Sequence, residues 1–141
     1  MPDQNFRCGD VLRCTSPYYA NQLGIGGQNG IVMGTKPHHI HLWFESQNRS
    51  FWLTYDILRK VEDVELTPLL KRLQLLTYLL DAEEWELDEK QDISKLICYV
   101  DRVPFETMVE IRNYLDFDYR SLSFYPEGMG RMIAEIEWNK D

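Results

Sequence analysis

A glycine-rich segment, residues 24–30, separates two short apolar runs at 11–14 and 31–33. Four of its seven residues are glycine and one is asparagine. These residue types adopt positive φ values at little steric cost, which a tight connection between strands requires. The segment therefore predicts that the first part of the chain folds as short strands joined by sharp turns.

The first 64 residues are expected to form five short strands. Ile40, Leu42 and Phe44 alternate with polar or aromatic neighbours, which predicts a strand with one apolar face. Strands this short bury their faces by curling into a small barrel. We expect them at residues 11–14, 31–36, 39–44, 51–53 and 59–61, with one helical turn at 55–58.

A resemblance accompanies this pattern. The chain carries Gly-Asp-Val at 9–11, Gly-Gln-Asn-Gly-Ile-Val at 27–32, the alternating strand, Phe-Trp-Leu at 51–53 and Ile-Leu at 57–58. This order resembles the SH3-like small barrels of the KOW and Tudor-like type, over residues 6–62. The resemblance implies an SH3-like fold, and such barrels host peptide-binding, nucleic-acid-binding and structural roles.

Residues 65–141 have a helical pattern. Thr67 and Pro68 are a typical N-cap and first helical residue. A broad apolar stripe follows, too wide for one neighbour to cover, so the helix is expected to pack between the two halves or to form a homodimer. The stripe consists of Leu69, Leu70, Leu73, Leu75, Leu76, Leu79 and Leu80.

Further helices are expected after Asp92 and after Pro104. The first carries Ile93, Leu96, Ile97 and Val100 at helical spacing, and the second places Phe105, Met108, Val109 and Leu115 on its inner face. Residues 126–138 fit a helix through Met129, Met132, Ile133 and Ile136, or a strand through Met132, Ala134, Ile136 and Trp138; the Pro126-Glu127 start favours the helix. The predicted fold is α+β: an SH3-like five-stranded barrel at 1–64, then an acidic domain of about four helices at 65–141.

The charge distribution constrains the partner. The net charge is −8, and residues 65–141 carry seventeen acidic and nine basic residues. Nucleic acid is disfavoured because phosphate binding depends on Lys and Arg. An acidic domain suits solubility, or a basic partner protein that its field would attract.

Cys8, Cys14 and Cys98 are odd in number and widely spaced. The N-terminal residues show no apolar signal-peptide region, and no apolar run reaches the ~20 residues that a membrane span needs. We therefore expect reduced thiols, no membrane partner and a cytoplasmic location.

All three histidines, His38, His39 and His41, lie within four residues. His39 and His41 would project from one strand face, and Cys8 or Cys14 could approach to complete a zinc or copper site. The paired Cys-x-x-Cys spacing of structural zinc sites is absent. The favoured interpretation is histidines on a solvent-facing strand and turn, so no metal and no cofactor are predicted.

An acidic segment at 81–92 has seven carboxylates in twelve residues. It lacks the mid-loop glycine of a calcium loop, and Trp85 and Leu87 interrupt its acids. The favoured interpretation is a solvated connection between helices. The alternative is a docking surface with Trp85 as an anchor and Glu83, Glu84 and Glu86 around it.

A second candidate surface is aromatic. Tyr18 and Tyr19 fall in the predicted loop after the first strand, and Trp43 shares the outer strand face with His39 and His41. Aromatic residues on a barrel rim can hold a proline-rich peptide or a cationic side chain. They can equally cover the barrel end or contact the helical half.

Catalytic groups are not predicted. The glycine segment matches neither a P-loop nor a dinucleotide fingerprint, and no histidine follows residue 41 to serve as a base for Cys98. The sequence favours a non-enzymatic protein-interaction or regulatory factor. The alternatives are an RNA- or ribosome-associated barrel of the KOW type and a metal-dependent enzyme that uses the strand at 38–41.

Overall fold

The computed structural model describes residues 5–62, 64–128 and 130–140. The chain divides into two compact units, Met1–Leu75 and Leu76–Asp141. The division falls inside the leucine-rich helix α2 (Pro68–Leu80), so each half of this helix is described with its own unit.

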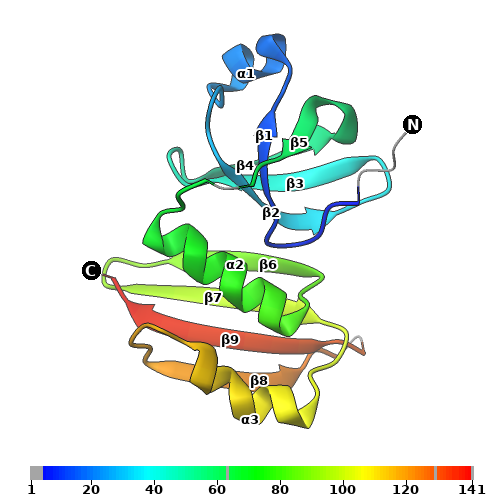
Figure 1. The fold of residues 1–141 in the computed structure, drawn as a ribbon. Helices are drawn as coiled ribbons and strands as arrows, with labels where there is room; N and C mark the ends of the chain where they lie inside the picture. Colours follow the sequence, from blue (N-terminus) through cyan, green and yellow to red (C-terminus); the bar gives the residue numbers. More distant parts are fainter. Residues whose placement is uncertain (1–4, 63, 129, 141) are drawn as a thin grey trace. The chain divides into compact units, whose positions relative to one another are not determined.

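The first unit contains a five-stranded antiparallel sheet (Figure 1). Its strand order is β4-β3-β2-β1-β5. All five strands lie where the sequence predicts them, within one or two residues. They are β1 (Val11–Cys14), β2 (Gly30–Thr35), β3 (His39–Phe44), β4 (Arg49–Thr54) and β5 (Leu58–Lys60).

The core of this unit lies on one face of the sheet. Ile40, Leu42 and Phe44 of β3 are fully buried there, as their alternation predicts. The glycine-rich segment contributes Ile25, which is also fully buried. Gly30 begins β2 at a close approach, because a Cβ atom there would lie 2.6 Å from Cγ of Leu42. The segment therefore closes over the core as well as turning the chain.

The predicted barrel is wrong, because the sheet does not close. β4 and β5 are the two ends of the strand order, and among the described residues they form no ladder with each other. β5 has only three residues, all paired with β1. Three residues from outside the sheet, Ile25, Phe6 and Ile57, pack in or against the core.

Residues 17–19 lie in a short helix and not in the predicted loop. Helix α1 (Pro17–Leu23) begins after Ser16, whose side chain accepts a hydrogen bond from the Tyr19 N–H. It ends at Gly24, which has φ 68° and donates its N–H to the Ala20 carbonyl. The predicted helical turn before β5 is confirmed as a 3-10 turn, η1 (Tyr55–Ile57).

The opposite face of this sheet is buried at its centre. Val11, Ile31 and Trp43 lie side by side on three neighbouring strands and are all buried. The first half of α2 belongs to this unit, and the Gln74 side chain donates to the Gly9 carbonyl at 3.0 Å. Leu70 and Leu73 of this half are buried. Both faces of the first sheet therefore carry buried apolar residues.

The second unit is built on a four-stranded antiparallel sheet (Figure 1). Its strand order is β6-β7-β9-β8. Helix α3 (Phe105–Tyr114) and the second half of α2 lie on one face of this sheet (Figure 1). The strands are β6 (Glu84–Glu89), β7 (Ile93–Val100), β8 (Ser121–Pro126) and β9 (Met132–Asn139).

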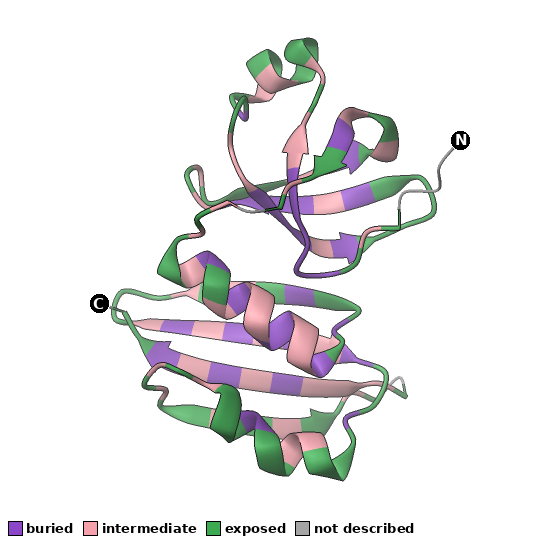
Figure 2. Cartoon of the chain, viewed as in Figure 1, coloured by how far each residue is buried: buried purple, intermediate pink, exposed green. Residues whose placement is uncertain are grey.

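The predicted bundle of about four helices is therefore wrong. Only α2 and α3 are helical in the described residues of 65–141. The segment after Asp92 is strand β7, in which Ser94, Leu96, Cys98 and Val100 are buried and their neighbours are half-buried. Figure 2 shows this alternation along both β7 and β9. β-branched and aromatic residues fit a pleated surface, and pairing with β6 and β9 fixes the period at two.

The favoured helix at 126–138 is also wrong. Residues 132–139 form β9, which places Ala134, Ile136 and Trp138 on the buried face as the strand alternative predicts. Met129 lies outside the described residues. Helix α3 is confirmed in position, but its predicted inner face is wrong: Phe105 and Val109 are exposed, and Ile111 is its buried residue.

Candidate functional site

The predicted aromatic rim is not assembled. Tyr18 and Tyr19 lie together on α1, 65% and 45% exposed, with their ring centroids 5.1 Å apart. Trp43 is only 7% exposed, because it belongs to the buried row with Val11 and Ile31. The proposed role of Trp43 in a surface rim is therefore wrong, and the two tyrosines remain as an exposed pair.

The acidic segment at 81–92 is not a connection between helices. Residues 84–89 form the edge strand β6, and strand alternation separates the predicted residues. Trp85 is 1% exposed on the helix-covered face, so it cannot anchor a partner. Glu84 and Glu86 point to the other face and are exposed, and Glu83 is exposed just before the strand.

Of the three histidines, His41 takes part in a different cluster, and His38 and His39 are exposed. His41 stacks on Trp52 with the ring centroids 4.4 Å apart and the planes at 11°, and its Nε2 lies 2.8 Å from Oγ of Ser50. Lys36 Nζ lies 4.4 Å from the centroid of the same indole. The indole of Trp52 therefore already contacts an imidazole and an ammonium group. Trp52 is nevertheless 44% exposed.

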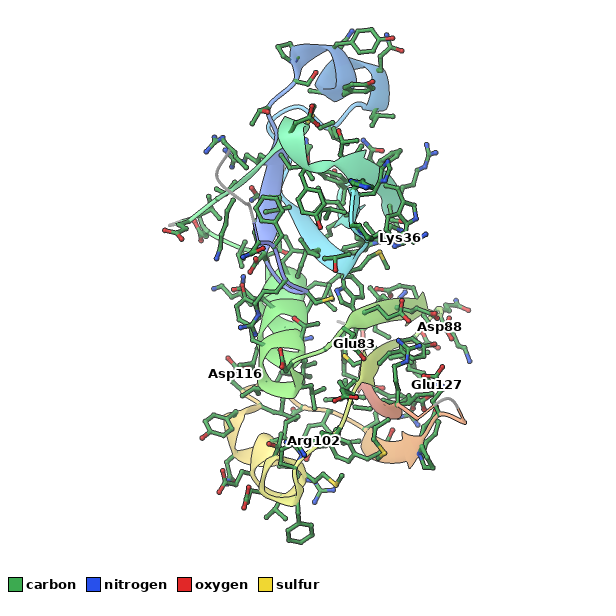
Figure 3. All side chains as sticks on the ribbon, turned by 90° about the vertical axis from the view of Figure 1, so that its right-hand side faces the viewer. Lys36, Glu83, Asp88, Arg102, Asp116 and Glu127 are labelled. Atoms are coloured by element: carbon green, nitrogen blue, oxygen red, sulfur yellow. The ribbon has the colours of Figure 1, made fainter. Side chains whose placement is uncertain are left out.

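The second sheet has one face that none of the described elements of its unit covers, and we call it the open face. On β6, β7 and β9 the residues of this face alternate with more deeply buried ones, and on β8 they alternate with half-buried Leu122 and Phe124. In Figure 3, Asp88 and Glu127 project from the side of the sheet opposite its helices. The open face consists of Glu84, Glu86 and Asp88 on β6, Lys95, Ile97 and Tyr99 on β7, Ile133, Glu135 and Glu137 on β9, and Ser121, Ser123 and Tyr125 on β8.

Two tyrosines on this face donate hydrogen bonds to carboxylates. Tyr99 donates its hydroxyl to Oε1 of Glu86 at 3.2 Å, and Tyr125 donates to Oε1 of Glu135. The hydrogen bond to Glu135 raises the pKa of Tyr125 to about 12. Desolvation, followed by the charge of Glu86, raises the pKa of Tyr99. Both phenols are therefore protonated donors at neutral pH and are poor nucleophiles.

The cations of the open face are held in ion pairs. Arg131, in the turn before β9, makes two hydrogen bonds to Glu127 at 2.9 and 3.2 Å and one to Glu84 at 3.0 Å. Its guanidinium carbon also lies 5.1 Å from the ring centroid of Tyr99. The pKa of Arg131 is raised, mainly by the hydrogen bonds to Glu127. Desolvation acts in the opposite direction, and the hydrogen bond to Glu84 raises the pKa further. Lys95 pairs with Glu137 at 3.4 Å.

Acidic groups predominate on the open face. Five strand carboxylates and Glu127 outnumber Lys95 and Arg131. Half-buried Ile97 lies between Glu86 and Glu135, and half-buried Ile133 lies between Tyr99 and Tyr125. Within the described part of the chain, no three His, Cys, Asp or Glu side chains are placed to hold a metal ion. The described open face therefore offers carboxylate acceptors, phenol groups and apolar area to a ligand.

Sequence reasoning identified Glu84 and Glu86 but missed Tyr99, Tyr125 and the acids of β9. Their shared face depends on the register of three strand pairs, and the segments of β7 and β9 were both predicted as helices. A signal existed in residues 132–138, where Glu135 and Glu137 alternate with Ala134, Ile136 and Trp138.

Comparison with protein-family models, with curated proteins and with solved structures found no match for this chain. No helix in the described residues combines the length and apolar character needed to cross a membrane. The functional argument therefore rests on the geometry of the open face.

Proposed function

We propose that this protein is a non-enzymatic protein-interaction factor that binds a basic partner protein through the open face of the second sheet. One observation carries the proposal: the carboxylates of β6 and β9 converge on a single uncovered face. That face also holds protonated phenols and half-buried isoleucines.

The chemistry favours a protein over a nucleic acid. Six carboxylates on and beside the face repel phosphates, and both nearby cations already pair with carboxylates. Arginine suits such a surface because its planar guanidinium donates hydrogen bonds to carboxylates along its edge and stacks on aromatic rings. Arg131 makes both kinds of contact within this chain, with Glu127 and Tyr99. We propose the cytoplasm as the location, in keeping with the three free cysteines.

An oligo-arginine peptide is a suitable probe of this proposal. We expect it to bind the full-length protein with an affinity that falls as salt rises, because exposed charges are screened beyond about 10 Å at ~0.1 M ionic strength. Neutralising the β6 row with Glu84→Gln, Glu86→Gln and Asp88→Asn should weaken binding about tenfold. These changes preserve side-chain size, and all three positions are exposed.

A matched variant controls for net charge. Glu106→Gln, Glu110→Gln and Asp116→Asn remove three exposed carboxylates from α3 and the loop after it. This control should bind the peptide within about twofold of the unmodified protein, since its charges lie off the open face. Equal loss in both variants would show that the peptide responds only to total charge and would overturn the proposed site. Tight binding of a single-stranded RNA at about 150 mM salt would favour the RNA-associated alternative instead.

A further inference from the structure

The four edge strands of the two sheets differ in how they are protected. An edge strand exposes unpaired N–H and C=O groups, and charged side chains or short length normally prevent pairing with another chain. β6 carries Glu84, Glu86 and Asp88, and β5 has three residues of which two are charged. β4 carries Arg49, and the indole of Trp52 is covered by Lys36. β8 is different: its six residues, Ser-Leu-Ser-Phe-Tyr-Pro, include no charge.

The backbone of β8 shows which groups face outward. The Glu127 N–H donates to the Arg131 carbonyl at 2.8 Å, which closes the β8–β9 hairpin. Hydrogen-bonded pairs recur at every second residue of an antiparallel ladder, so Ser121, Ser123 and Tyr125 direct their backbone groups toward β9. The N–H and C=O groups of Leu122 and Phe124 then point to the unpaired side. The backbone of Pro126 also points to the unpaired side, so the missing N–H of this proline removes no hydrogen bond to β9.

We propose that β8 pairs antiparallel with β8 of a second copy of this chain, which joins the two four-stranded sheets into one. Of the self-complementary registers, the one that pairs Leu122 with Phe124 uses outward groups that each have both an N–H and a C=O, whereas a register centred on Phe124 would pair Leu122 with Pro126, which has no N–H. Leu122 lies opposite Phe124 of the second copy, Ser123 lies opposite Ser123, and about four inter-chain N–H···O bonds form. No charged side chain meets another across this junction, so the carboxylates that prevent such pairing at β6 do not oppose it.

Helix α3 provides an independent observation. It lies over the β8 side of the sheet (Figure 1), and it exposes two apolar side chains one turn apart. Phe105 is 77% exposed and Val109 is 55% exposed. Residues at i and i+4 share one helix face. Pairing at β8 would bring the two α3 helices toward each other on the same face of the joined sheet, where these side chains would be covered. The dimer requires no basic partner, so it stands or falls separately from the proposed function.

Cysteine cross-linking tests the register. In a hydrogen-bonded ladder through Leu122 and Phe124, the two Ser123 residues form a non-hydrogen-bonded pair with Cα atoms about 4.5 Å apart, within disulfide range. Ser123→Cys should therefore cross-link almost completely under mild oxidation. Ser121→Cys is the matched control: the two copies of residue 121 lie about 13 Å apart along the strands, beyond disulfide reach. Both variants carry Cys14→Ser, because Cys14 is the partly exposed native thiol.

Sedimentation of the unmodified full-length protein completes the test. We expect a dimer at about 100 µM protein that dissociates on dilution, since association depends on concentration. Ser123→Asp should lower the dimer fraction at least threefold because it places two like charges across the symmetry axis, whereas Ser121→Asp should lower it less. A monomer at every concentration, or equal cross-linking at 121 and 123, would overturn the proposed pairing.

Discussion

The two sheets of this protein differ in whether the face opposite their main core is buried. In the first sheet, Trp43 and its neighbours are buried on the face opposite the core. In the second sheet, the corresponding face carries carboxylates and tyrosines and remains uncovered within its unit. An antiparallel sheet needs only one covered face to be stable, so the other is free to vary. The two tryptophans predicted to bind partners, Trp43 and Trp85, are buried, and the proposed binding residues come from the acidic strands of the second sheet.

The largest expected effect distinguishes a buried tryptophan from an exposed one. Trp85→Ala in the second unit should reduce the free energy of unfolding by about 3–5 kcal/mol, because Trp85 is fully buried and its loss leaves a cavity. Trp52→Ala, at a 44% exposed position in the first unit, should cost less than ~1 kcal/mol. Urea unfolding measures both, and similar losses would contradict the assigned burial.

A smaller effect is expected from overpacking the first unit. Gly30→Ala should destabilise by about 1–3 kcal/mol, because the added Cβ would lie 2.6 Å from Cγ of Leu42 and 2.9 Å from Cε1 of Phe44. Gly26→Ala is the control, since its Cβ would meet only the Ala20 Cβ at 3.6 Å, and it should change stability by less than ~0.5 kcal/mol. Thermal or urea unfolding that ranked the two variants in the opposite order would refute the packing at Gly30.

The open face of the second sheet makes a prediction about pH. The pKa of Tyr125 is raised from 10.0 to about 12, chiefly by its hydrogen bond to Glu135. A raised folded-state pKa stabilises the protein fully below pH 10, and that contribution is lost as the pH rises through about 12. Glu135→Gln should return the pKa of Tyr125 toward 10.0 in a titration of tyrosinate absorbance, with Tyr125→Phe identifying the signal. Glu86→Gln alters the hydrogen-bond partner of Tyr99 and should leave the pKa of Tyr125 raised.

The smallest effect concerns the tyrosines of the first unit. Tyr18→Ala and Tyr19→Ala remove exposed side chains from α1 and should each change stability by less than ~0.5 kcal/mol. Oligo-arginine binding should also stay within about twofold, because these residues lie outside the open face. Binding that depended on Tyr19 and ignored the β6 carboxylates would move the partner site to α1 and reverse the contrast between the two units.

Local sequence patterns predicted the structure correctly where a few neighbouring residues determine the backbone conformation. The alternation of Ile40, Leu42 and Phe44 predicted β3 and its core face, and Thr67-Pro68 located the start of α2, where the Leu70 N–H donates to the Thr67 side chain. Capping and period-two patterning act over a few residues, so they are legible in the sequence.

Tertiary structure decided the remainder. Ile93, Leu96, Ile97 and Val100 fit a helical period, yet Leu96, Cys98 and Val100 also fit a strand, and the pairing of β7 with β6 and β9 determined which period was adopted. The open face has the same origin: Glu86, Tyr99 and Glu135 are far apart in the chain and share a surface only through strand register. The sequence by itself determined the strands of the first sheet, the position of two helices and the acidic character of the second half. The faces of the second sheet were decided by long-range backbone pairing, whose partners no local pattern specifies.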